Sequence, residues 1–302
     1  MAMSFLNWFN RHGAFFVALL FVGVPAVFAG DTTTIRLTDD GRLKRDPVFT
    51  DASGESLVYV VQENPIQLRL MKLNLKSDTE EPIHKDETRS EFEPAYSADG
   101  RVLSFVQNIG NLRWQLAIVD FKTGKRAFAN VGPGGFSGLR SPAVFPDASR
   151  VWFSQANGGR QHLYSIDLDG KNVKQMTDFE GVTNWPSFTA DGKRVVFSSS
   201  REGNYDIYVM NVDGTGLKKL TENPRQDIRP CLSPDGSQIA FTSSRDGNYE
   251  VYVIGTDGNE VTRITESSER DDYPAWHPDG KRLVTVSERK GRFDLYLLTV
   301  PE

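Results

Sequence analysis

A motif that returns every 44 residues constrains this chain more than any other feature of its sequence. The segment "NWPSFTADGKRVVFSSSREGNYDIYVMNVDGTGLKKLTE" (184–222) aligns without a gap on "IRPCLSPDGSQIAFTSSRDGNYEVYVIGTDGNEVTRITE" (228–266), and "DYPAWHPDGKRLVTVSERKGRFDLYLLTVPE" (272–302) continues the frame. Self-similarity at a fixed period indicates that one structural unit is repeated along the chain. The fold is therefore predicted unit by unit.

Each unit contains an anchoring proline, and six such prolines cover most of the chain. Upstream, residues 139–170 and 92–124 fit the same frame, and residues 45–74 fit it more loosely. The anchors, at intervals of 47, 48, 44, 44 and 44 residues, are Pro47, Pro94, Pro142, Pro186, Pro230 and Pro274. We therefore expect one repeat domain over residues 30–302.

Within each unit the residue pattern is that of β-strands. The run 195–198, "VVFS", follows the Asp191-Gly192 pair, and Asp-Gly is a strong hairpin signal because Gly tolerates positive φ. The next run, "YDIYVMNV", is rich in aromatic and β-branched residues, and a further turn leads to "KKLT". Four antiparallel strands in 40–50 residues are typical of a propeller blade of the WD type. The sequence thus predicts an all-β fold, a six-bladed β-propeller.

The segment "TIRLTD" (34–39) resembles the last residues of a repeat, although it precedes the first repeat. Thr38 precedes Pro47 by 9 residues, and Thr221 precedes Pro230 by the same number. The last repeat stops after its third strand, "FDLYLLTV". We expect residues 34–38 to supply the fourth strand of the sixth blade, beside residues 295–298, because an open third strand would leave an unpaired edge.

Residues 1–29 have the layout of a cleavable signal peptide. Arg11 is their only Lys, Arg, Asp or Glu, an uncharged run extends from Gly13 to Gly30, and Val27-Phe28-Ala29 resembles a signal-peptidase site. The alternative is an uncleaved anchor, because the run approaches the length of a membrane span. Cleavage predicts an exported, periplasmic protein with no integral membrane contact.

Charge and cysteine content exclude further classes of partner and bond. The formal net charge of −5 argues against a nucleic-acid partner, since counterion release requires clustered Lys and Arg. The single cysteine, Cys231, permits no intramolecular disulfide. Its equivalents in the other repeats are mostly small, which indicates a small apolar filler near the channel. They are Val48, Ala95, Ala143, Ser187 and Ala275.

The repeat consensus, "RxxPxFSPDGxxIAFxSxRxGNYxIYVMxxDGxxxxxLT", is carried best by residues 183–222 and 227–266. It resembles the propeller repeat of the TolB family of the Tol–Pal system. The resemblance implies a six-bladed periplasmic propeller that binds other proteins without chemistry, with a lipoprotein partner on one propeller face. Three departures stand against it: no α/β domain is expected before the first strand, "TDASGES" carries an extra residue in the first repeat, and Asp147-Ala148 replaces Asp-Gly in the third.

The sequence predicts no catalytic residues. His84, His162 and His277 fall at three different places in the repeat frame, so they should not converge on one centre. "GGFSG" (134–138) lacks the spacing of a nucleophile elbow, and the Gly-rich stretch 131–140 precedes a strand and not a helix, so it is interpreted as a connector. The Asp-Gly pairs are interpreted as turn formers and not as metal ligands.

A second repeated feature combines opposite charges. Arg201, Arg245 and Arg289 recur in one hairpin turn, and an acid follows each of them by five residues. These acids are Asp206, Glu250 and Asp294. Each Arg is expected to hold its own hairpin or to bridge to the next blade; a binding stripe is the alternative.

The residues just before each anchoring Pro vary while the frame stays fixed, and blade packing does not require their mixture of aromatic, Arg and acidic types. Such residues are enriched at protein-binding hot spots, so this rim is a candidate partner site, with a solvated loop face as the alternative. Trp185 and Tyr273 would be the main apolar contacts to the partner, and Arg140 and Arg229 would bind its acidic groups. The full set is Arg45, Asp46, Glu93, Arg140, Asn184, Trp185, Asp227, Arg229, Asp271, Asp272 and Tyr273.

The leading function is thus a non-catalytic periplasmic scaffold that binds a protein of the cell envelope, a lipoprotein or a peptide. The alternative is a polysaccharide-binding or lyase-type propeller with calcium or manganese at the channel mouth, for which Asp227 and Asp271 are weak candidate ligands. A purely structural module within a larger assembly is the third hypothesis. Fold alone does not choose among them.

Overall fold

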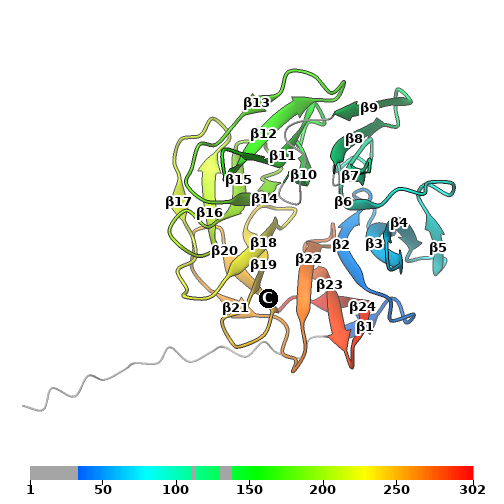
Figure 1. The fold of residues 1–302 in the computed structure, drawn as a ribbon. Helices are drawn as coiled ribbons and strands as arrows, with labels where there is room; N and C mark the ends of the chain where they lie inside the picture. Colours follow the sequence, from blue (N-terminus) through cyan, green and yellow to red (C-terminus); the bar gives the residue numbers. More distant parts are fainter. Residues whose placement is uncertain (1–32, 111–112, 130–137, 302) are drawn as a thin grey trace, which may run out of the picture.

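The computed structural model describes residues 33–110, 113–129 and 138–301. Six four-stranded antiparallel sheets stand as blades around a central axis (Figure 1). This confirms the six-bladed propeller predicted from the repeat. The proposed signal peptide (1–29) and most of the Gly-rich connector (131–140) lie outside the described residues.

The strands of the first three blades run outward from the axis in chain order. They are β2 (Lys44–Phe49), β3 (Ser56–Asn64), β4 (Gln67–Asn74) and β5 (Thr79–Pro82); β6 (Glu91–Tyr96), β7 (Val102–Asn108), β8 (Trp114–Asp120) and β9 (Lys125–Ala129); and β10 (Leu139–Val144), β11 (Arg150–Asn157), β12 (Arg160–Asp167) and β13 (Lys174–Gln175).

The last three blades follow the same order, except that the sixth takes its outer strand from the start of the chain. They are β14 (Thr183–Phe188), β15 (Arg194–Ser199), β16 (Asp206–Asn211) and β17 (Lys218–Lys219); β18 (Asp227–Leu232), β19 (Gln238–Ser243), β20 (Glu250–Gly255) and β21 (Thr262–Arg263); and β22 (Asp271–Trp276), β23 (Arg282–Arg289), β24 (Arg292–Thr299) and β1 (Thr34–Arg36).

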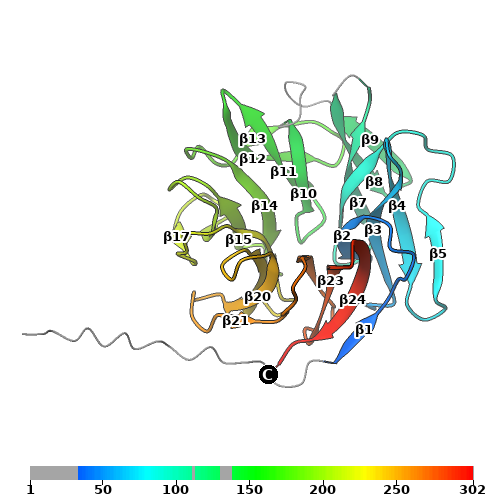
Figure 2. The same cartoon turned by 60° about the horizontal axis from the view of Figure 1, so that its bottom comes forward.

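The ring closes by backbone pairing between the two ends of the chain. In β1, Ile35 lies opposite Leu297 of β24, and the amide of Leu37 donates to the carbonyl of Leu295 over 2.8 Å. Figure 2 shows β1 alongside β24. The prediction that residues 34–38 complete the sixth blade is therefore confirmed.

Thr38 makes the same contacts as the Thr that ends other repeats. Its Oγ1 accepts a hydrogen bond from the amide of Leu295 at 3.0 Å and donates to Asp294 at 3.0 Å. Thr221, in the fourth blade, accepts from the amide of Ile207 at 3.0 Å in the same way. Residues 34–38 therefore make the hydrogen bonds that the fourth strand makes in other blades.

Side-chain packing seals the same junction. A buried cluster joins the first blade to the sixth, and Tyr59 of β3 and Leu295 of β24 are both fully buried in it. Burying side chains of this size stabilises a fold by roughly 1.5–3 kcal/mol each relative to exposure.

Within the described ranges, no helix has the length and apolar character needed to cross a membrane.

The repeated Arg residues hold their own blades, but not through the acids five residues later. Arg245 bonds Asp227 of its own inner strand at 3.0 Å, and Arg289 bonds Asp271 at 2.9 Å. Arg201, whose blade has Thr183 at that place, lies instead over the rings of Phe179 and Tyr208.

The acids five residues on are bound by cations of the fourth strand. Lys219 lies 3.0 Å from Asp206 and Arg263 lies 3.2 Å from Glu250. In the closing blade Arg36 lies 2.6 Å from Asp294. Both sets of pairs are internal to the blades, so the alternative of a charged binding stripe is not supported by their geometry.

Candidate functional site

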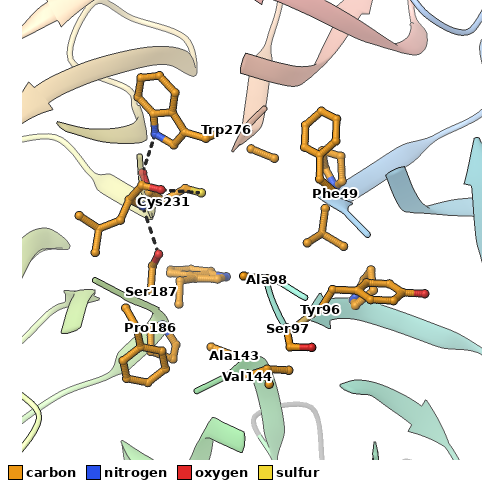
Figure 3. A pocket seen from close by; sticks show the side chains of 18 of the residues that line it. Phe49, Tyr96, Ser97, Ala98, Ala143, Val144, Pro186, Ser187, Cys231 and Trp276 are labelled. Carbon is orange, nitrogen blue, oxygen red and sulfur yellow. Dashed lines mark hydrogen bonds between the residues drawn. The ribbon is translucent and has the colours of Figure 1, made fainter. Parts of the chain in front are cut away.

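The six inner strands surround a central channel. Its cavity has a volume of about 510 Å³ and is lined by every inner strand and by the turn that follows each one. Figure 3 looks into this cavity, where labelled side chains from all six blades surround an open space. The channel has two ends, one beside the residues that precede the anchoring prolines and the other beside the turns.

Every inner strand carries a bulge immediately before its proline. The pairing register shifts there in all six sheets. The residue before each proline has φ between 51° and 58° although none is Gly. This left-handed conformation costs about 1–2 kcal/mol per residue, and a bulge changes the direction of the side chain it carries. The six residues are Asp46, Glu93, Ser141, Trp185, Arg229 and Tyr273.

All six of these side chains line the cavity, and we call this ring the charged mouth. The sequence places these residues beside the channel but does not show the bulge. A residue before proline favours extended backbone, so the repeated prolines alone do not predict left-handed residues at these positions. The blade frame imposes the backbone conformation but leaves the side chain free to vary.

One half of the charged mouth, from the first three blades, is acidic and polar. The amide of Ser141 donates to Oε2 of Glu93 over 2.6 Å, and Arg140 lies 3.7 Å from the same carboxylate. Arg45 Nε lies 3.0 Å from Oδ2 of Asp46. Burial and the neighbouring Asp46 raise the pKa of Glu93, against the opposing effect of the two arginines.

The other half, from the last three blades, is a stack of aromatic rings around a cation. The guanidinium carbon of Arg229 lies 5.0 Å from the ring centre of Trp185 and 4.2 Å from that of Tyr273. Arg229 also lies 3.2 Å from Asp272 and donates to the Tyr273 hydroxyl over 3.3 Å. These contacts hold the guanidinium at the channel wall.

Three polar atoms of the charged mouth are buried without a hydrogen-bond partner among the described residues. They are Oδ2 of Asp46, Oγ of Ser141 and Nε of Arg229. Ser141 is only 5% exposed. An unsatisfied buried donor or acceptor costs about 1–3 kcal/mol, so a hydrogen-bonding group that reached these three atoms from the channel would stabilise the mouth.

Other predicted site residues are buried inside the blades. Asp227 and Asp271 are fully buried and bonded to Arg245 and Arg289, as described above. Asp272 is 1% exposed and accepts a hydrogen bond from Thr242 at 2.8 Å. Asn184, also buried, accepts from Ser154. Arg45 and Arg140 are half-buried beside the charged mouth.

The opposite end of the channel, the turn mouth, has a different lining. Each blade contributes an Ala or a Pro from the turn after its inner strand, and the carboxylate of the lining at this end is that of Asp51. The Asp of a turn bonds backbone: Asp191 Oδ1 accepts from the amide of Lys193 at 3.0 Å. The Ala and Pro residues are Ala52, Ala98, Pro146, Ala190, Pro234 and Pro278.

The wall between the two mouths is apolar. Cys231 lies in it, and its carbonyl accepts a hydrogen bond from the Trp276 indole at 2.9 Å (Figure 3). Burial raises the pKa of the Cys231 thiol, which disfavours the reactive thiolate.

The candidate metal ligands Asp227 and Asp271 are each paired with an arginine. Among the described residues, no group of three or more His, Cys, Asp or Glu side chains is placed to hold an ion. Asp227 and Asp271 each face an arginine at hydrogen-bond distance, and a guanidinium at that position competes with a cation for the carboxylate oxygens.

Comparison with known proteins gives a consistent fold assignment. The sequence model of the TolB beta propeller domain matches residues 56–222 and 138–301. The Tol-Pal system protein TolB of Xanthomonas campestris pv. campestris (strain B100) is 31% identical over 92 residues, which are 30% of this chain and 20% of that relative. The match therefore spans a fifth of the relative's length.

Two solved structures extend the likeness over most of the chain. TolB from Acinetobacter baumannii superposes with a TM-score of 0.68 at 23% identity, covering 82% of this chain and 65% of that one. An oligogalacturonate lyase in complex with manganese superposes with a TM-score of 0.59 at 15% identity, covering 91% and 95%. At these identities the likeness shows the fold alone.

Proposed function

Because the chain belongs to the family of the TolB beta propeller domain, we propose that it is a non-catalytic binding scaffold of the periplasm. In this proposal it has a role related to the Tol–Pal envelope system and captures a protein partner, a lipoprotein or a peptide, at the charged mouth. The leader-like residues 1–29 support export. Similarity to the Tol-Pal system protein TolB of Xanthomonas campestris supports a role in the cell envelope.

The observation that carries the proposal is the ring of six side chains held toward the channel by strained backbone. Strain of this kind persists where the surrounding structure enforces it, and it clusters at binding and active sites. The ring combines Trp185, Arg229 and Tyr273, three residue types enriched at binding hot spots. Their mutual stacking fixes their positions before a partner arrives, which lowers the entropic cost of binding.

The partner site consists of the residues that remain accessible at this mouth. Asp227, Asp271, Asp272 and Asn184 are excluded from direct contact because they are buried in internal bonds. Among them, Asp272 supports the ring, because it lies 3.2 Å from Arg229 and accepts a hydrogen bond from the amide of Tyr273 at 2.7 Å. Substitution of Trp185 tests the site most cleanly, because substitution of Arg229 would also remove an ion-pair partner of the buried Asp272.

Capture in intact periplasm, followed by identification of the crosslinked protein, tests this function. We expect Trp185→Ala to reduce capture at least tenfold, which corresponds to about 1.4 kcal/mol. Phe128→Ala is the matched control, because Phe128 is an exposed aromatic on the outer strand β9, away from the channel. Equal capture by the two variants would contradict the proposal.

The alternative, a polysaccharide-binding or lyase-type propeller with a metal, rests on the fold shared with the oligogalacturonate lyase. Asp46 and Glu93 are the carboxylates of the charged mouth that such a site would use. If calcium or manganese raised the melting temperature of the wild-type protein but not of Asp46→Asn, ligand linkage would favour the alternative. On the scaffold proposal neither ion changes the melting temperature.

A further inference from the structure

The channel between the two mouths has the size and lining of a small-molecule site. Its volume of about 510 Å³ falls within the roughly 300–1,000 Å³ of typical ligand pockets, which combine apolar walls with a few polar groups. The polar groups are concentrated at one end here. The apolar wall includes Val48, Ala143, Val144, Phe188, Leu232 and Trp276.

The charges of the charged mouth select the head group of a ligand. Asp46 and Glu93 lie in one half of the ring and Arg229 lies in the other. All three side chains line the same cavity. Burial lowers the pKa of Arg229, whereas Asp272, Tyr273, Asp46 and Glu93 raise it, and the net shift is upward. Arg45 and Arg140 flank the two carboxylates, but Oδ2 of Asp46 accepts no hydrogen bond among the described residues. A purely anionic head would meet this carboxylate oxygen, and a purely cationic head would meet the guanidinium of Arg229. A head group that bears both charges is complementary to both halves.

Two of the three unpartnered atoms are donors, and they indicate where the negative end of such a head group would lie. Ser141 Oγ and Arg229 Nε are buried, belong to residues that line the cavity and have no hydrogen-bond partner among the described residues. A ligand carboxylate offers two oxygens that accept hydrogen bonds. The same carboxylate would bond to the side chain of Ser141 and to Arg229, which belong to different halves of the ring.

We propose that the channel binds a small zwitterion with an apolar side chain, as found in a hydrophobic α-amino acid. The carboxylate accepts hydrogen bonds from Arg229 and Ser141, the ammonium group faces Asp46 and Glu93, and the side chain enters the apolar wall. This site goes beyond capture of a protein partner, because binding of the small molecule requires the propeller alone.

Calorimetric titration of the purified propeller with a matched ligand series tests the head group. L-phenylalanine is the probe, N-acetyl-phenylalanine lacks the positive charge, phenylalaninamide lacks the negative charge, and glycine lacks the apolar side chain. We expect phenylalanine to bind and each of the other three to bind at least tenfold more weakly. Equal binding of N-acetyl-phenylalanine, or absence of phenylalanine binding up to its solubility limit, would overturn the proposal.

Variants of the channel test the location. We expect Asp46→Asn, which keeps a side chain tolerant of positive φ, and Arg229→Gln each to weaken phenylalanine binding at least tenfold. Glu222→Gln, an exposed carboxylate outside the channel, is the matched control and should bind as the wild type does. Equal affinity of Asp46→Asn and Glu222→Gln would contradict the assignment.

Filling the apolar wall provides an independent measurement. Ala143→Phe should abolish phenylalanine binding by occupying the channel, and its folding is checked by its thermal transition. If that variant does not fold, Val48→Phe from the first blade replaces it. Retained binding in a folded, filled variant would overturn the proposal.

The two proposals fail separately. Loss of partner capture in Trp185→Ala, with the absence of phenylalanine binding by the wild type, would overturn the small-molecule site and leave the scaffold standing. Phenylalanine binding that follows the ligand series, with capture unaffected by Trp185→Ala, would overturn the scaffold proposal and support the small-molecule site.

Discussion

The two mouths of the channel are built by the same six repeats and differ completely in chemistry. At the turn mouth every blade contributes an Ala or a Pro. At the charged mouth the six equivalent residues include two acids, a serine, an arginine and two aromatics. Both rings lie on the same inner strands and their turns, so position in the frame alone does not explain the difference.

The requirements of folding explain the uniform ring. A turn before Asp-Gly tolerates small residues and favours Pro, which presets φ near −65°. Each turn Asp then satisfies the backbone, as Asp235 does for the amide of Ser237 at 3.0 Å. At the other mouth the frame requires only a bulge. A position at which the fold constrains the backbone and not the side chain is available for recognition, and this comparison favours the charged mouth as the site.

The comparison requires a closed ring, and opening that ring should have the largest effect. Deleting residues 31–39 removes β1 and leaves Asp294, which is 2% exposed, without Arg36 and Thr38. Lys44 stays 3.3 Å from Asp294, so the main loss is the backbone pairing of β1 with β24 that closes the ring. We expect a sharp fall in melting temperature, measured by calorimetry, and loss of both mouths together. Unchanged unfolding would refute the closure.

Protonation should affect the two mouths with opposite sign. The pKa of Glu93 is raised above its ordinary 4.5, mainly by burial, so its protonated form is favoured by folding. The stability it contributes is fully present below pH 4.5 and is lost as pH rises through the folded-state pKa. Relative to the wild type, Glu93→Gln should therefore gain stability as pH rises above 4.5 in urea unfolding.

The turn Asp residues should show the reverse. The pKa of Asp235 is lowered from its ordinary 3.8, first by the hydroxyl of Ser233 and then by the amide of Ser237. Its contribution is present above pH 3.8 and is lost as pH falls through the folded-state pKa. Asp235→Asn should be less stable than the wild type at neutral pH, and the difference should shrink in acid. The same pH profile for both variants would contradict the comparison.

The smallest effect concerns backbone strain. Ser141→Gly relieves a left-handed residue and removes a buried, unpartnered hydroxyl. After the entropy of Gly is subtracted, the free energy of unfolding should rise by up to about 1 kcal/mol. Ala190 is outside the set of residues with positive φ, so Ala190→Gly should lower it by about 0.5–1 kcal/mol. Equal changes in the free energy of unfolding for Ser141→Gly and Ala190→Gly, measured by urea unfolding, would mean that backbone strain does not distinguish the two mouths.

The repeat predicted the blades, their number and the closure, because each follows from spacing alone. Thr38 stands at the place of Thr221 in the frame, and the same hydrogen bonds result. Spacing also located the variable residues before each proline. It could not show which of them face the channel, since that depends on the bulge.

Side-chain pairing was the part that spacing could not supply. The acid five residues after Arg245 was the near neighbour in sequence, but Asp227 is the neighbour across the sheet. Two strands of one sheet bring residues 18 positions apart into contact, and the choice between such partners is made by side-chain direction. Asp227 and Asp271 therefore appeared to be rim acids and are buried structural ones.

The assignment of recognition to one mouth is tested most directly by photo-crosslinking in intact periplasm. A photoreactive amino acid replaces Trp185 at the charged mouth in one variant and Ala190 at the turn mouth in the other; both residues line the same channel from the same blade. We expect a crosslinked partner from position 185 and none from position 190. Crosslinking from position 190 alone would contradict the account.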